Sequence, residues 1–310
     1  MTDILLNYAM PIEKVTPLLG ADLGFLHNAL VLVKPKDESV ARAVVECLST
    51  AEVQNLTNAE AYEMLDAGMS SIYVLPTDSL DLSELDLSNY GYYTIIIDEA
   101  FTKEEVEARD FGEFGGVVSY MSTDRDYIKS FNLQDWNAGF YGKIVNGAIN
   151  MYRSFGKLLS AFSWKNQQYI EMEADDGITT LNEANVLFEA KANFVLNSPR
   201  YGRRLALFSA GNKAIVAPYI YEEICNNIQG WGLQYINLNQ PDYTVRDAKL
   251  MQEFIQNKLN TNYVNKGLVP SATCNIEVVD GSNFVASGGV VIGEPKALWR
   301  VETTVQQGEI

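Results

Sequence analysis

The side chains that could carry out chemistry are few and scattered along this chain. His27 is the only histidine among 310 residues, and it lies in a glycine-containing segment near the N-terminus. A catalytic triad or a histidine-based metal site would have to use it alone, so a structural or surface role is favoured. Cys47, Cys225 and Cys274 are far apart and form no CxxC pair, so we expect reduced, mostly buried thiols without a structural disulfide.

Asp98 and Glu99 are the strongest catalytic candidates. They end residues 92–100, a β-branched and almost continuously apolar run that predicts a strand buried on both faces. Enzymes with open α/β sheets bind ligands at the carboxyl ends of parallel strands, which is where this pair falls. A polar residue must also appear wherever a buried strand returns to the surface, and we favour this structural interpretation.

The remaining patterns indicate no cofactor and no metal. No G-x-x-x-x-G-K-[ST] loop is present, and no G-x-G-x-x-G follows a strand, so the sequence lacks a nucleotide-binding motif. An acidic stretch at residues 77–89 does not fit a calcium-binding loop and is typical of a solvated surface loop. Its carboxylates are Asp78, Asp81, Glu84 and Asp86.

Charge and hydropathy exclude several classes of partner. The formal net charge is -17, which argues against nucleic acids and anionic membranes because both attract basic surfaces. No apolar run approaches the roughly 20 residues that span a bilayer. No basic region precedes the first apolar residues, as it would in a signal peptide. We therefore expect a soluble protein made in the cytoplasm.

The first half of the chain predicts an open, mostly parallel α/β sheet with flanking helices, in a domain of residues 21–140. Residues 71–76 and 116–121 flank the run at 92–100, and the three segments are interpreted as neighbouring strands. Further strands are predicted at 29–34 and 44–48. Helix-capping patterns begin at Ser49, Thr57 and Thr102.

The second half predicts a second α/β domain at residues 141–295. Apolar spacing predicts an amphipathic helix over 144–162, and Thr180 begins a helix through about residue 195. Further helices are expected from Pro218 to Gly230 and from Thr244 to about residue 259. Strands are predicted at 167–173, 203–209, 233–238, 272–279 and 289–292.

Both ends of the chain alternate with the period of a strand and have no hairpin partner nearby. Such strands are templates for pairing with another chain, so we interpret residues 1–20 and 296–310 as arms that join subunits. The alternative is that each pairs within its own subunit. The residues assigned to strand exchange are Ile4, Leu6, Tyr8, Met10, Trp299, Val301, Thr303 and Val305.

The order of these segments resembles a known family. Residues 40–76 combine a strand, capped short helices and the sequence Ala-Gly-Met-Ser-Ser-Ile-Tyr-Val-Leu-Pro. Later come Ala-Pro-Tyr-Ile-Tyr-Glu-Glu-Ile at 217–224, a long helix, Lys-Gly-Leu-Val at 266–269 and a closing strand from residue 294. This arrangement is similar to the sheath subunits of contractile phage tails and related injection machines.

The resemblance implies a structural protein without enzyme activity, in which neighbouring subunits exchange terminal strands. Its subunits would form hexameric rings, stacked helically around a tail tube, and would contract to drive the tube through a host envelope. The tail tube protein, the baseplate and the tail terminator would be its other partners. It would be assembled in the host cytoplasm and reside in the tail of the virion.

Two departures from the family pattern affect the expected tube contacts. The chain is short for a sheath subunit, so outward-protruding insertions should be missing. The usual arginine-rich run is reduced to Arg203 and Arg204, which we predict to contact the tube together with Lys249 and Lys258.

Two other functions stay open at this point. One is a flavodoxin-like or hydrolase-like α/β enzyme that uses Asp98 and Glu99. The other is a different structural protein of the tail, such as a tube or completion subunit. Size separates the first from a sheath, because an enzyme should form a small oligomer and a sheath long tubes.

Overall fold

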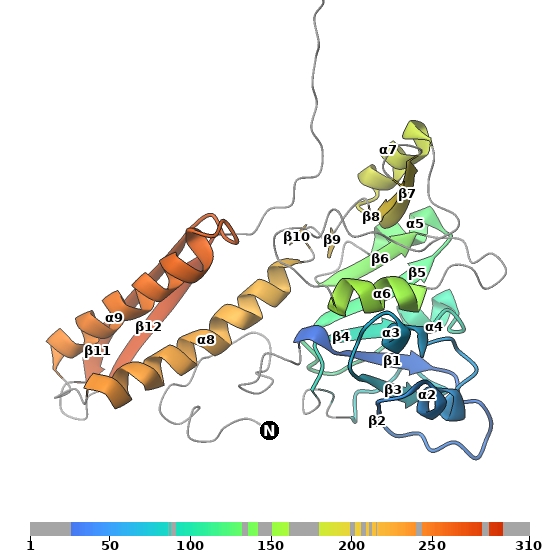
Figure 1. Cartoon of the computed structure of the whole chain (residues 1–310), viewed down its shortest axis with the longest axis horizontal. Coiled ribbons are helices and arrows are strands. Elements are labelled where there is room, and N and C mark those ends of the chain that lie inside the picture. The colour runs from blue at the N-terminus through green and yellow to red at the C-terminus, as the bar shows by residue number, and fades with distance from the viewer. Residues whose placement is uncertain are drawn as a thin grey trace, which may run out of the picture.

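The structure, a computed structural model, consists of a large sheet with its helices and a smaller module built on two long helices and a hairpin (Figure 1). It describes residues 26–85, 87, 91–131, 136–141, 151–160, 180–198, 202–205, 209–210, 213–214, 216–239, 244–280 and 285–293. Among its helices, none is both long enough and apolar enough to cross a membrane.

The large sheet has eight strands in the order β2-β3-β1-β4-β5-β6-β7-β8. Only the edge strands β2 and β8 pair antiparallel to their neighbours, so the predicted open and mostly parallel sheet is confirmed. The strands are β1 (Ala29–Val33), β2 (Val45–Cys47), β3 (Ile72–Pro76), β4 (Thr94–Ile97), β5 (Val117–Ser122), β6 (Asn137–Tyr141), β7 (Asn193–Ser198) and β8 (Gly202–Leu205).

Strands β1 and β4 form the buried centre of this sheet. Every residue of both is buried, as their unbroken apolar sequences predict. Alternate side chains serve two cores, since Val31 and Ile96 face one and Leu30 and Ile95 face the other. The predicted adjacency of 71–76 and 92–100 is wrong, because β1 pairs with β3 on one side and β4 on the other.

Helices cover both faces of the sheet. Helices α2 (Thr50–Leu56), α3 (Glu63–Asp66) and α6 (Met151–Ser160) contribute to one core, whereas α4 (Lys103–Glu107) and α5 (Arg125–Phe131) contribute to the other. The capping boxes at Ser49 and Thr102 are confirmed. The one at Thr57 is wrong, because its hydroxyl donates to the Lys34 carbonyl at 2.8 Å and α3 begins only at residue 63.

Helix α7 (Leu181–Glu189) is shorter than predicted. Lys191 adopts a left-handed conformation, with φ of 54°, and the Ala192 N–H donates to the Leu187 carbonyl, which ends the helix. Strand β7 begins at Asn193 and, with β8, continues the sheet beyond residue 140, where the sequence had suggested that the sheet domain ends. A small pair, β9 (Ser209–Ala210) and β10 (Lys213–Ala214), follows.

Helix α8 (Val216–Asn239) connects the sheet to the smaller module (Figure 1). The predicted stop at Gly230 and the strand at 233–238 are wrong, because one helix of 24 residues spans both. Ile224, Trp231 and Tyr235 keep the helical spacing across Gly230 and pack toward helix α9. The continued apolar face overrides the glycine, whose cost in a helix is only about 1 kcal/mol.

The first turns of α8 are fixed to the sheet by tyrosines. The Tyr93 hydroxyl donates to the Pro218 carbonyl at 3.3 Å, and the hydroxyls of Thr94 and Tyr219 lie 2.6 Å apart. The rings of Tyr93 and Tyr219 also meet edge to face. The smaller module then adds α9 (Val245–Leu259), the π-helical turn η4 (Asn260–Val264), β11 (Ala272–Asp280) and β12 (Val285–Ile292).

Adding a methyl group at each of two helical glycines should change the stability of the protein in opposite directions. A Cβ at Gly230 would meet no atom within 4 Å, so Gly230→Ala should stabilise the protein by roughly 0.5–1 kcal/mol. A Cβ at Gly156 would lie 2.7 Å from the Met64 carbonyl oxygen, so Gly156→Ala should destabilise it. Urea unfolding measures both, and a loss of stability in Gly230→Ala would contradict this account of α8.

Candidate functional site

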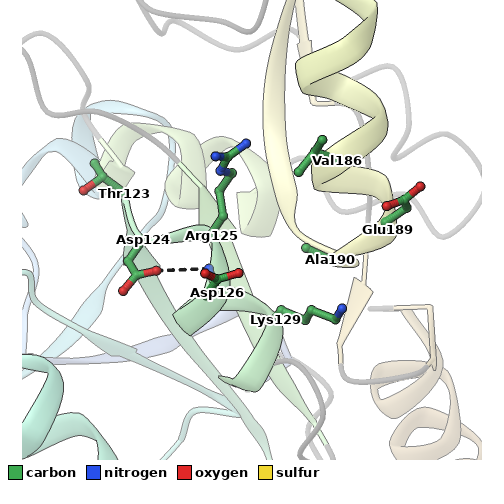
Figure 2. Close-up of a pocket in the computed structure, with 8 residues that line it drawn as sticks. All are labelled: Thr123, Asp124, Arg125, Asp126, Lys129, Val186, Glu189 and Ala190. Atoms are coloured by element: carbon green, nitrogen blue, oxygen red, sulfur yellow. Dashed lines mark hydrogen bonds between the residues drawn. The ribbon is translucent and has the colours of Figure 1, made fainter.

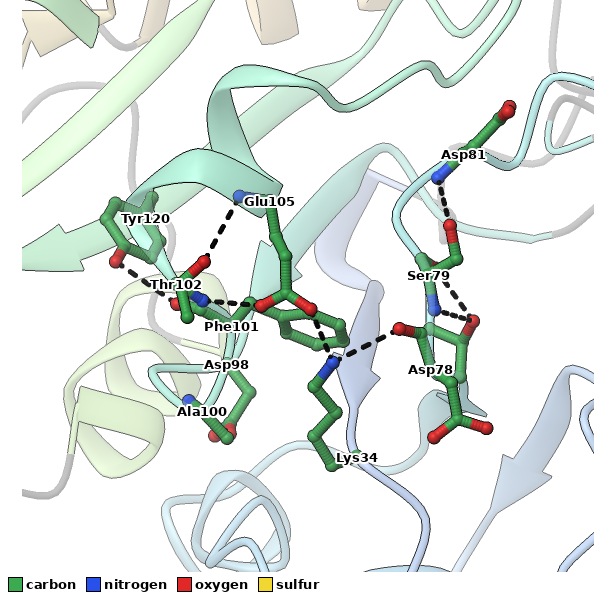
Figure 3. A network of polar contacts seen from close by, with 11 residues as sticks. Lys34, Asp78, Ser79, Asp81, Asp98, Ala100, Phe101, Thr102, Glu105 and Tyr120 are labelled. Carbon is green, nitrogen blue, oxygen red and sulfur yellow. Dashed lines mark hydrogen bonds and ion pairs between the residues drawn. The ribbon is translucent and has the colours of Figure 1, made fainter.

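Asp98 directly follows the central strand β4 and links helix α6 to it. Asp98 is only 4% exposed, and its carboxylate accepts a hydrogen bond from the Ala100 N–H at 2.9 Å (Figure 3). It also accepts one from the Tyr152 hydroxyl of α6. Burial, and then the charge of Asp98, raise the pKa of Tyr152 well above its usual value. Both oxygens of this carboxylate therefore serve the fold.

Glu99 lies at the surface beside Asp98. Partial desolvation, followed by the charges of Asp98 and Glu60, raises the pKa of its carboxyl group. The other catalytic candidate, His27, lies just before β1 and contacts the C-terminal end of α6, where its Nδ1 is 3.0 Å from the Leu159 carbonyl oxygen. Asp98 therefore bonds to Tyr152 and to the backbone, and His27 bonds to a different part of α6.

The acidic loop is tied into ordinary surface contacts. Asp78 forms an ion pair with Arg42 at 3.0 Å, and Asp81 accepts from the Ser83 hydroxyl at 2.8 Å. No group of three or more histidine, cysteine or acidic residues suited to a metal occurs in the part of the chain that the structure describes. Asp86 lies outside that part.

Lys34 links three segments around the end of β1 (Figure 3). Its ammonium group donates to Glu105 at 2.8 Å and to the Asp78 carbonyl at 3.2 Å, and it lies 4.1 Å from the centre of the Phe101 ring. The hydrogen bond from Lys34 lowers the pKa of the Glu105 carboxyl group. This network fastens α4 to the sheet and holds no group poised for reaction.

An open groove of about 580 Å³ lies between the start of α5 and the end of α7 (Figure 2). Most of its lining side chains are charged, with both signs present, and Val186 and Ala190 supply its apolar surface. Ligand pockets are mainly apolar with a few converging polar groups. The Asp124 carboxylate in this groove already accepts from two backbone N–H groups of α5. We assign no ligand to it.

The feature best suited to an interaction is the β11–β12 hairpin. Its strands form a separate two-stranded antiparallel sheet. Ala272 and Cys274 of β11 join Ile255 and Leu259 of α9 in a compact apolar core with the face of α8. Strand β12 is eight residues long, contains neither a charge nor a proline, and exposes 75% of Val291. Edge strands that stay exposed usually carry charges or prolines, which prevent pairing with another chain. The composition of β12 is therefore that of a strand that pairs with a further strand.

Two glutamines of α9 bond directly to the backbone of β11. The Cys274 N–H donates to Gln256 Oε1 at 2.8 Å, and Gln256 Nε2 donates to the Ala272 carbonyl at 2.8 Å. The Ile276 N–H donates to Gln252 Oε1 at 3.0 Å. These contacts place α9 along β11 rather than along β12.

A polar network ties the same module to α8. The buried Tyr263 hydroxyl of η4 donates to Glu223 at 2.8 Å and accepts from the Asn227 amide at 2.6 Å. Burial and the charge of Glu223 raise the pKa of Tyr263. Because both partners lie on α8, this network fixes the helix relative to the hairpin.

Few of the residues predicted to contact other subunits or the tube lie in the described part of the chain. Residues 1–25 and 294–310 lie outside the described part, so both predicted arms stay predictions. Arg203 and Arg204 lie in β8 at the edge of the large sheet, and Lys249 and Lys258 lie on α9. These basic residues therefore belong to two separate elements. Lys249 is exposed, and Lys258 lies over the Phe254 ring at 5.4 Å.

Neither a protein-family model nor a curated protein matches the sequence. Solved structures do match, over almost the whole chain. A chain of the anti-feeding prophage (AFP) baseplate has a TM-score of 0.67 and 13% identity, covering 96% of this chain and 98% of that one.

Two matching structures are sheaths in the contracted state. The sheath complex of PVC, an extracellular contractile injection system, has a TM-score of 0.65 at 10% identity, over 96% of both chains. The AFP helical sheath has a TM-score of 0.63 at 13% identity, over 96% of this chain and 97% of that one. The chain has the sheath fold. The matches cover 96% of this chain, so the similarity in fold is not confined to the large sheet.

The contacts of Asp98 predict how this sheath-fold protein responds to loss of the carboxylate charge. Asp98→Asn weakens the bond to Tyr152 and should lower the free energy of unfolding by about 1–2 kcal/mol. Glu99→Gln, at the surface, should change it by less than about 0.5 kcal/mol. Urea unfolding measures both. A hydrolase or transferase activity that either variant abolished while still folded would overturn the structural role.

Proposed function

We propose that this protein is the structural subunit of a contractile sheath, polymerising as stacked hexameric rings around an inner tube and contracting to drive that tube through an envelope. The observation that carries the proposal is the match over 96% of the chain to sheaths of two contractile injection systems. A sheath subunit needs no catalytic centre, which agrees with the structural use of Asp98.

Strand exchange would join the subunits. The alternating segments at residues 3–10 and 297–305 would each complete a sheet in a neighbouring subunit, and the β11–β12 hairpin is a suitable acceptor. A strand on a flexible tether lets neighbours rotate and slide without separating, as a sheath that shortens as one piece requires. The arms would comprise residues 1–20 and 296–310.

The smaller module would face the tube. Its contacts with the tube would include Lys249, which is exposed on α9, and Lys258. Arg203 and Arg204, in β8 of the large sheet, would be further contacts. Beyond the tube protein, the subunit would contact a baseplate at one end and a terminator at the other. The assembly would form in the host cytoplasm and act as a phage tail or a related injection machine.

Deleting an arm tests strand exchange. Chains that lack residues 1–10 or 296–310 should stay folded and monodisperse but no longer build tubes, because neither strand belongs to the core of its own subunit. Val301→Pro should act likewise, since proline removes a backbone donor from the middle of a strand. Circular dichroism and light scattering measure folding and assembly. Truncated chains that unfold as monomers would show that both strands belong to their own subunit.

Assembly should also depend on salt. Subunits with a net charge of -17 repel one another, and the screening length falls from about 10 Å at 0.1 M salt to about 3 Å at 1 M. Tubes should therefore form more readily as ionic strength rises, which light scattering follows. Scattering that falls steadily with added salt would mean that ion pairs between subunits supply the attraction.

A further inference from the structure

Helix α8 carries a stripe of buried polar side chains on the side that faces away from α9. This polar stripe consists of Glu222, Asn226 and Gln229, which are 3%, 7% and 1% exposed. At about 100° per residue, Gln229 lies about 180° around the helix from Ile220, which belongs to the core shared with α9. Polar side chains buried this deeply need hydrogen-bond partners, so this face of α8 is a covered surface.

Asn226, in the middle of the polar stripe, is only partly satisfied. Its amide nitrogen donates to the carbonyl oxygen of Glu222 at 2.9 Å and to Glu222 Oε1 at 3.0 Å. Its Oδ1 atom is buried and accepts no hydrogen bond from the described residues. An amide oxygen accepts readily from a backbone N–H, which a chain lying along the helix would supply.

The same face becomes apolar toward the end of α8. Leu233 and Ile236 lie within about 40° of Gln229 around the helix, and both are half-buried. The core with α9 instead uses Ile224 and Trp231, on the opposite side. A segment that covers this face should therefore offer backbone groups beside the polar stripe and apolar side chains beyond it.

The chain enters the sheet next to this face. Leu26 is buried, and the Asn28 carbonyl accepts from the Tyr93 N–H at 3.4 Å. The Tyr93 hydroxyl in turn donates to the Pro218 carbonyl in the first turn of α8. Burial, and then the charge of Glu222, raise the pKa of Tyr93, so the polar stripe begins beside the same ring. Residues that precede Leu26 therefore start at the near end of the stripe.

We propose that residues 18–25 lie extended along this face of α8 in their own subunit, with their backbone paired to the polar stripe and their leucines packed on Leu233 and Ile236. This segment, the N-terminal stem, would leave only residues 1–17 free to reach a neighbouring subunit. The inference concerns the unassembled chain, so it does not depend on the proposed sheath function.

The length of the N-terminal stem matches that of the face. From Pro218 to Ile236, α8 rises about 27 Å at about 1.5 Å per residue. Eight extended residues at about 3.3 Å each span about 26 Å. Leu18 and Leu19 would therefore arrive at the apolar end of the face, and Ala21 would lie near Gln229.

The sequence of the stem, Leu-Leu-Gly-Ala-Asp-Leu-Gly-Phe, also suits this position. Its two glycines allow the backbone to approach a helix closely. It carries one charge, Asp22, whereas residues 161–179 carry four acidic side chains and one lysine. That segment follows α6, whose last turn contacts His27, so it also starts near this face. The buried carboxylate of Glu222 would repel so acidic a segment.

Hydrogen exchange of the unassembled full-length chain tests the proposed pairing. The amides of residues 18–25 should exchange slowly, and Gln229→Leu should accelerate them by at least about tenfold while leaving Val31 of β1 unchanged. Gln234→Leu is the matched control, because it makes the same change at an exposed position of α8, and it should have no effect. Rapid exchange of residues 18–25 in the unmodified chain, or equal exchange in the two variants, would overturn the proposal.

Engineered disulfides identify the covering segment without relying on a variant of the stripe that must stay paired. In a Cys225→Ala background, Gln229→Cys is combined with Gly20→Cys, Ala21→Cys or Asp22→Cys, which covers neighbouring registers. The two remaining native cysteines are buried. After oxidation at a concentration where the chain is monomeric, mass spectrometry should find an intramolecular link for at least one pair.

The other outcomes of this oxidation decide against the stem. Gln234→Cys, combined with the same three changes, is the control and should form no link. A link from Gln229→Cys to Gln168→Cys or Trp299→Cys, with none to the stem, would assign the face to another segment. Links that appear only in dimers would mean that a second copy covers the face. Each of these results, or no link at all, would overturn the proposal, whereas failure to form tubes would overturn only the proposed function.

Discussion

The requirement that backbone donors and acceptors be paired governs how this protein is built. At the centre of the large sheet, β1 and β4 satisfy it completely, because each has a parallel neighbour on both sides and helices above and below. At its margins, β2 and β8 are short and antiparallel, which limits their use as templates. Among the residues that the structure describes, the hairpin of the smaller module meets the requirement on its β11 edge, through side chains of α9.

Hydrogen bonds along helix α8 join the large sheet to the smaller module. Helix α8 starts against the sheet through Tyr93, Thr94 and Tyr219, and continues without a break to the network of Tyr263. One unbroken helix therefore links the two parts. In a sheath, the strand links between subunits would then be the natural place for movement.

Much of the sheet was predictable because its signals are local. The apolar runs of β1 and β4 identify buried strands, and Ser49 and Thr102 identify helix starts. The errors arose where distant contacts outweigh local preference. The helical face of α8 carries through Gly230, and the order of β3, β1 and β4 depends on a crossover that no local pattern encodes.

The candidate site was predictable only in outline. Residues 272–279 and 289–292 were predicted as strands, and the structure adds that they pair with each other. The role of Gln252 and Gln256 depends on contacts across 16 to 24 residues of sequence, which periodicity does not reveal. The available signal was their spacing of one helical turn, on the side of α9 that also carries apolar residues.

Electron microscopy of the purified full-length chain tests the central claim, that this protein is a sheath subunit, most directly. The account predicts tubes of uniform diameter with a regular repeat along their axis, in negative stain at raised ionic strength or on addition of a tube template. Monomers or small discrete oligomers under all these conditions would contradict it.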